Sequence, residues 1–187
     1  KPNFIESYIN LAEAYFLNKQ HKEALAILNE AKKKGKNPNT ISFLYNEIVK
    51  DYSAELVEEG LDYFQKENFV LAISKIKDAI LIKPDFKAAY DNLAYIYFLK
   101  GLFPEAVIYL NNSIELDNRD VNAYKFLGEI KYQMGEYAQA VAYFKEALSL
   151  GADGAEIHNN LCFAEQGKVF RHGWSAGLRY EYATGSG

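Results

Sequence analysis

The strongest constraint on this chain is a set of residue columns that recur every 34 positions. Two columns hold small residues: Gly60, Ala94 and Gly128, and then Ala72, Ala106 and Ala140. Two hold aromatic residues: Tyr63 and Tyr97, and then Phe69, Phe103 and Tyr137. A fixed period of this length predicts a stack of small helical units, each of which contacts mainly its neighbours.

The period is clearest in blocks 53–86, 87–120 and 121–154. In block 87–120, one face of a helix is marked at positions i, i+3, i+4 and i+7 by Tyr90, Leu93, Ala94 and Tyr97. Gly101 ends that helix, and helical spacing resumes after Phe103. We therefore expect two helices and a turn in each block.

Block 121–154 carries seven spaced positions of a known pattern: Tyr124, Leu127–Gly128, Gly135–Glu136–Tyr137, Ala140, Phe144 and Ala147. The pattern resembles the tetratricopeptide repeat, although Lys131 and Ala152 stand where that family has Tyr and Pro. The resemblance implies an all-α fold, a right-handed α-solenoid of helix-turn-helix units in a single domain over 1–187.

A further copy fits at 5–38, where His21 takes the aromatic turn position of the pattern. A helical insertion at 39–52 separates it from the next block. Because no Gly or Pro lies between Asn39 and Glu59, residues 40–65 are expected to form one long helix or two nearly continuous ones. Pro38 is a helix-start signal just before it.

The pattern decays after 154, so 155–184 is interpreted as a degenerate repeat or a capping segment. Ala155–Gln166 is predicted to be a first helix, with Leu161 and Cys162 at its packing positions. Two alternatives stay open for the rest: a final helix through Ala176, Tyr180 and Ala183, or an irregular or strand-like tail. Residues 185–187 are expected to be a flexible tail.

Composition excludes several classes of partner. A net charge of −4 and a pI near 5.5 argue against nucleic acid, because phosphate binding needs a concentrated basic surface. No apolar stretch is long enough to predict direct membrane insertion. The single cysteine fits a reducing, cytoplasmic setting. A periplasmic or membrane-associated location is the alternative if the chain, which begins at Lys1, is a trimmed fragment. Lys-, Asn-, Ile- and Tyr-rich usage suggests a bacterial source.

The chain offers no constellation for catalysis. The three histidines do not stand at metal-ligand spacing, and no second cysteine accompanies Cys162. Cys162, His21 and His158 are therefore assigned to packing. We expect neither a metal nor a cofactor, and we predict a protein that is not an enzyme.

Helical geometry instead points to a binding face. On each first helix a second set of positions centres about 130° from the packing face. The family resemblance implies that this inner face lines a concave groove in which peptides bind. The partner-binding candidates are Asp91, Asn92, Tyr95, Phe98, Leu99, Asn122, Lys125, Glu129, Tyr132 and Asn159, with Gln133 and Phe163 beside them. The alternative is that Tyr95, Phe98 and Leu99 only pack on an adjoining helix or a second copy.

One subclass of the family grips a C-terminal carboxylate with five Lys, Asn and Arg side chains. Asn92 matches only the middle position. Ile9 and Glu13, or Val57 and Leu61, stand where the first Lys and Asn are required, and Asn122 and Phe126 stand where the last two cations are required. The carboxylate clamp is absent, so binding of a chaperone tail in that way is not expected. The leading hypothesis is thus a scaffold or adaptor for another protein or peptide. The alternatives are a non-catalytic region of a larger enzyme or envelope protein, or a scaffold that self-assembles as a homo-oligomer.

Overall fold

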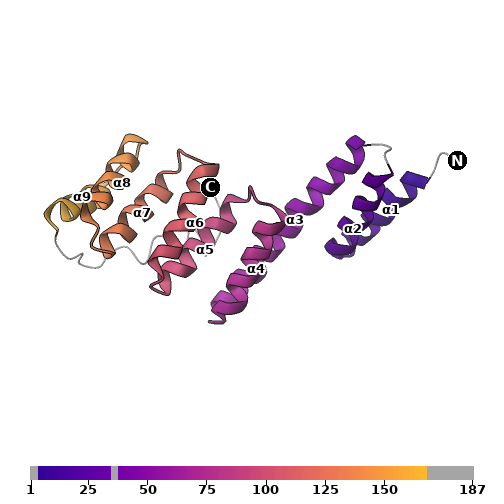
Figure 1. Cartoon of the computed structure of the whole chain (residues 1–187), viewed down its shortest axis with the longest axis horizontal. Helices are drawn as coiled ribbons and strands as arrows, with labels where there is room; N and C mark the ends of the chain where they lie inside the picture. The colour runs from indigo at the N-terminus through magenta and orange to yellow at the C-terminus, as the bar shows by residue number, and fades with distance from the viewer. Residues whose placement is uncertain (1–3, 35–37, 168–187) are drawn as a thin grey trace.

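The computed structural model describes residues 4–34 and 38–167, which fold into helices without any strand. The helices follow one another along the long axis of the molecule, with α1 and α2 at one end and α8 and α9 at the other (Figure 1). Their bounds are α1 Phe4–Leu17, α2 His21–Lys33, α3 Pro38–Gln65, α4 Phe69–Ile82, α5 Lys87–Leu99, α6 Phe103–Leu116, α7 Val121–Gln133, α8 Tyr137–Ser149 and α9 Ala155–Gln166.

Each helix packs on the next one in the chain, and the odd-numbered helix of each pair is the first helix of a unit. The small-residue columns lie where the two helices of a unit approach most closely. A Cβ added to Gly60 would lie 2.6 Å from Cγ1 of Ile76 on α4, and one added to Gly128 would lie 2.5 Å from Cε1 of Phe144 on α8. The expected all-α solenoid of helix-turn-helix units is therefore confirmed, with a physical reason for its glycines.

The stretch 40–65 forms one helix rather than two, since α3 runs without a break for 28 residues. Its first half supplies Ile41, Leu44 and Ile48 to a core shared with α1 and α2. Its second half supplies Leu56 and Val57 to a separate core that continues to α7. In Figure 1, α3 accordingly spans the distance between the N-terminal helix pair and α4.

His21 lies between these two cores. It is 2% exposed, its ring lies 5.2 Å from that of Tyr52 and 5.6 Å from that of Phe16, and its Nε2 lies 2.7 Å from Oε2 of Glu55. The packing role expected for His21 is confirmed, and a carboxylate partner on α3 adds to it.

The predictions for the last unit need correction. Helix α9 has the expected bounds, but Cys162 and His158 are exposed, whereas Ile157, Asn160 and Ala164 are buried. The physical reason is that, among the described helices, α9 packs mainly on α7 and α8. The face of α9 that carries Cys162 corresponds to the one where α7 meets α8, and the described part of the chain has no later helix to cover it. The alternatives for the tail, His172 and the flexible 185–187 lie outside the described residues.

Candidate functional site

The inner-face candidates come from α5, α7 and α9, but their exposure differs sharply. Leu99, Asn122 and Asn159 are exposed, and Phe98 and Lys125 are half-buried. The other five are buried, with exposed fractions of 3% to 8%: Asp91, Asn92, Tyr95, Glu129 and Tyr132. The face thus combines exposed side chains such as Leu99 and Asn122 with buried polar side chains such as Asp91 and Glu129.

An aromatic row connects three successive first helices beneath this surface. The Tyr95 ring lies 6.2 Å from Phe64 of α3 and 6.4 Å from Phe126 of α7. Phe98 meets Phe126 edge to face, with ring centroids 5.0 Å apart. Tyr95 and Phe98 therefore pack on an adjoining helix, which is the alternative that the sequence left open for them. Phe126 was not among the candidates, although its place in block 121–154 is one turn before that of Glu129.

Asp91 belongs to a polar network that joins α5, α6 and α7. Lys87 Nζ donates to Oδ2 of Asp91 at 2.8 Å and lies 2.5 Å from Oδ2 of Asp120. Ser113 Oγ donates to the second oxygen of Asp91 at 2.5 Å. Asp120 also caps α7, because its Oδ1 accepts hydrogen bonds from the Asn122 and Ala123 amides. Both oxygens of Asp91 are thus engaged within the chain, so its main contribution is to hold α5 and α7 in place.

The protonation states fit this structural role. Burial alone would lower the pKa of Lys87, but the hydrogen bonds to Asp120 and Asp91 outweigh it and raise that pKa. Burial raises the pKa of Asp91, because it outweighs the hydrogen bonds from Lys87 and Ser113, which act in the opposite direction. The charged Lys87 therefore stabilises two carboxylates at the junction of three helices.

Two asparagines carry buried amide atoms. Asn92 Nδ2 donates to the Ala88 carbonyl at 2.8 Å, while its Oδ1 has no hydrogen-bond partner in the described structure. Nδ2 of Asn160 on α9 is likewise buried without a partner. Asn160 could not be identified from the sequence pattern, because that pattern assigned the packing face of α9 to Cys162. Its exposed neighbour Asn159 was selected instead.

Glu129 is the most perturbed acid on this face. Burial, with a smaller effect from Glu156, raises its pKa to about 7, although a hydrogen bond from Gln133 acts against the shift. That bond, from Gln133 Nε2 to Glu129 Oε1, is 3.3 Å long and comes from the same helix. A carboxyl group with this pKa exchanges its proton near neutral pH. It can therefore act as a hydrogen-bond donor when protonated and as an acceptor when ionised.

Within 4–34 and 38–167, no three or more His, Cys, Asp or Glu side chains are arranged to hold a metal ion. No helix in the same ranges combines the length and apolar character needed to cross a bilayer. The arrangement on the inner face is suited to hydrogen bonding and packing.

Fold and site together define a helical-repeat solenoid with a polar and aromatic face along its first helices. Two sequence profiles of the tetratricopeptide repeat match the chain, over residues 86–152 and 5–33. The chain belongs to the tetratricopeptide repeat family. Comparison with curated proteins gives no match.

Solved structures with the same fold include domains captured with peptides. The TPR2B domain of yeast Sti1 in its pHsp70 complex is 27% identical, with a TM-score of 0.56 over 62% of this chain and 97% of that one. The first TPR of Spaghetti bound to an HSP90 peptide is 22% identical, with a TM-score of 0.57 over 62% and 92%. The MamA protein is similar over a longer stretch, 89% of this chain and 84% of its own, at 17% identity and a TM-score of 0.57.

Proposed function

We propose that this protein is an interaction scaffold that holds a peptide or an extended segment of a partner along the inner face of α5, α7 and α9. The observation that carries the proposal is the state of Glu129. The residue is 8% exposed, and the one hydrogen bond described for its carboxyl group is 3.3 Å long. Burial of an acid that is so weakly hydrogen-bonded costs free energy, which a donor group of a partner would offset.

The surroundings of Glu129 support a partner with both polar and apolar groups. Lys125 precedes it by one turn on α7, and Asn122 and Asn159 are exposed nearby on the same face. Leu99, 44% exposed, supplies apolar area on α5. A main chain in extended conformation offers the amides and carbonyls that such side chains bind. The yeast Sti1 TPR2B domain, which is similar in fold and 27% identical, is found in a pHsp70 complex.

The proposal is tested with a random dodecamer peptide library displayed on phage and selected on the wild-type chain. We expect the enriched peptides to bind Lys125→Glu roughly tenfold more weakly than wild type, a loss typical of an important interface contact. Ile108→Lys is the matched control, because Ile108 is 57% exposed but lies on α6, a second helix. Circular dichroism establishes that each variant keeps its helices.

The role of Glu129 is tested through pH. Peptides with a basic side chain at the contact should bind more tightly as pH rises through about 7, because the carboxyl group becomes charged. Glu129→Gln should remove this dependence. A selection in which no enriched peptide binds Lys125→Glu or Glu129→Gln more weakly than wild type would contradict the assignment of the inner face.

A further inference from the structure

The insertion in α3 interrupts the layer of second helices. At about 1.5 Å per residue, α3 is about 42 Å long, roughly twice the length of its neighbours. Helix α2 shares a core with the first half of α3, whereas α4 packs on the second half. A cleft of about 450 Å³ lies between the first turns of α2 and the last turn of α4.

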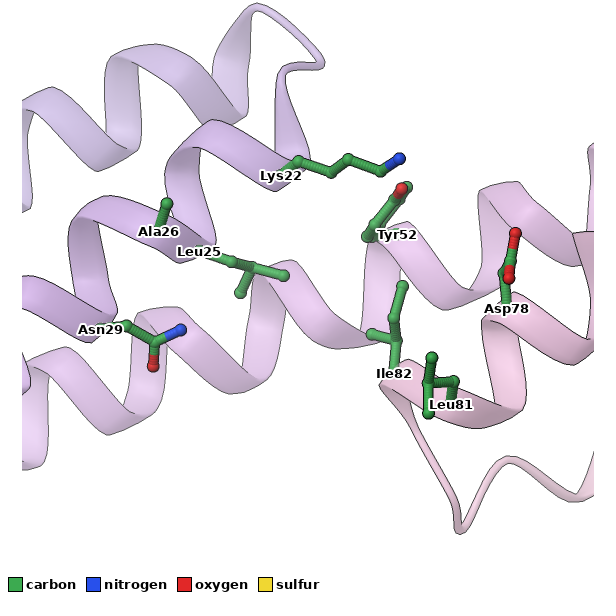
Figure 2. A pocket seen from close by; sticks show the side chains of 8 residues that line it. All are labelled: Lys22, Leu25, Ala26, Asn29, Tyr52, Asp78, Leu81 and Ile82. Carbon is green, nitrogen blue, oxygen red and sulfur yellow. The ribbon is translucent and has the colours of Figure 1, made fainter.

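The cleft is lined mainly by residues from one face of α2 and from the end of α4. From α2 come Lys22, Leu25, Ala26 and Asn29, at the spacing i, i+3, i+4 and i+7. From α4 come Asp78, Leu81 and Ile82, and Tyr52 of α3 lies between the two walls (Figure 2). Leu81 is 81% exposed, so the cleft contains apolar surface that the described chain leaves uncovered.

The two walls carry opposite charge. Lys22 stands on the α2 wall and Asp78 on the α4 wall (Figure 2), and neither forms an ion pair with another described residue. The backbone adds to the same asymmetry, because the positive end of the α2 dipole and the negative end of the α4 dipole both lie at the cleft. An occupant therefore meets a positive wall, apolar surface and a negative wall.

We propose that this cleft is a second docking site, for a peptide segment of a partner protein with apolar side chains flanked by an acidic and a basic residue. The acidic residue pairs with Lys22, the basic residue with Asp78, and the apolar side chains cover Leu25, Leu81 and Ile82. An apolar small molecule would fill the cleft but leave both charges unpaired. The walls of the site come from the second helices α2 and α4, so it is distinct from the inner face of α5, α7 and α9.

The experiment uses the same dodecamer library and sorts the enriched peptides by their dependence on Leu81. We expect one class with an acidic residue, two or three apolar residues and a basic residue, bound at least about tenfold more weakly by Leu81→Lys and by Lys22→Glu. Val70→Lys is the matched control, because Val70 is 80% exposed on the same helix outside the cleft. Both positions are exposed, so the substitutions leave the core intact.

A charge exchange makes the test specific. The double variant Lys22→Glu with Asp78→Lys should lose the selected peptide and bind a synthetic version in which the acidic and basic residues are exchanged. The proposal is overturned if no enriched peptide depends on Leu81, or if the exchanged peptide gains no affinity. It is also overturned if wild type forms a dimer by sedimentation and Leu81→Lys does not, since a second copy then fills the cleft. Peptides that depend on Lys125 report on the inner face, so the two proposals fail separately.

Discussion

The N-terminal region, made of α1, α2 and the first half of α3, and the array from α5 to α8 use the same helical unit but differ in how their cores connect. The N-terminal core is self-contained and ends at Ile48. In the array, one core runs from Leu56 on α3 through both helices of the α5–α6 unit to Ile130 on α7, and a third core joins the end of α7 to α8 and α9. The difference teaches that a repeat chain can divide its stability into segments without breaking its backbone helix.

The turns of the two regions differ as well. Each of the first four units has a residue with positive φ between its helices. Lys19 and Glu67 hold this position in the first two, at φ 60° and 58°, and Gly101 and Gly135 in the next two, at 71° and 76°. Because only glycine adopts this conformation without steric cost, the early turns store strain that the later turns avoid.

The largest expected effect tests whether the N-terminal core and the core of the array are independent. Ile48→Ala and Leu110→Ala each remove a side chain that is 0% exposed, so each should lower the free energy of unfolding by about 2–5 kcal/mol. Ile48→Ala should reduce the hydrogen-exchange protection of α1 and α2 and leave α6 to α8 protected. Leu110→Ala should reduce protection from α4 to α7, the helices that share its core. Equal loss in α2 and α7 for both variants would show that the cores are not independent.

A pH effect of about 3 kcal/mol is expected in the array alone. Burial raises the pKa of Glu129 from 4.5 to about 7, so between these values the folded state keeps a proton that the unfolded chain has lost. The free energy of unfolding therefore decreases as pH rises through this window, by about 3 kcal/mol. Urea unfolding at pH 5 and pH 8 should show the decrease in wild type and not in Glu129→Gln. Glu47→Gln, at an exposed position of α3, is the control and should keep the decrease.

Gly128→Ala should cost about 1–3 kcal/mol, because its Cβ would lie 2.5 Å from the fully buried Phe144 ring. Alanine has the better helix propensity, so a gain in thermal stability would show that Phe144 moves aside at low cost. The comparison variant is Gly60→Ala, which meets the more flexible Ile76 side chain and should lose less. Thermal unfolding of both variants measures the difference.

The smallest effect concerns the turns. Lys19→Gly and Glu67→Gly should each stabilise the chain by up to about 1 kcal/mol, because glycine relieves the positive φ. Gly101→Lys should have the opposite sign and similar size. Denaturant midpoints at an unchanged slope measure these changes in stability. If Lys19→Gly destabilises, the ion pair of Lys19 with Asp51 at 3.4 Å outweighs the strain.

Sequence reasoning succeeded where one helix meets its own partner. The 34-residue columns mark Gly60 and Gly128, and the reason is the contact with Ile76 and Phe144 inside a single unit. It was less informative about contacts between units. A helical wheel assigns Tyr95 to the inner face, but whether Phe64 and Phe126 cover it depends on how neighbouring first helices pack.

The raised pKa of Glu129 and the cleft beside Leu81 could not be predicted from the sequence for the same reason. Both depend on contacts between elements far apart in the sequence. The signals that were available are more modest. Asp120, immediately before α7, is a typical helix-capping residue. The same residue forms the ion pair with Lys87 at the junction of α5, α6 and α7. For α9, the pattern gave the helix but not its buried face, because that face depends on which helices surround it.

The length of the insertion in α3 also sets a rotation. At about 100° per residue, the fourteen residues 39–52 turn the helix through about four revolutions, short by roughly 40°. Residues fourteen positions apart on α3 therefore point in nearly the same direction. An insertion of two heptads shifts one part of the solenoid along the helix axis while almost preserving its orientation. Chains of this design can thus vary the spacing of their units in steps of two heptads without twisting one half away from the other.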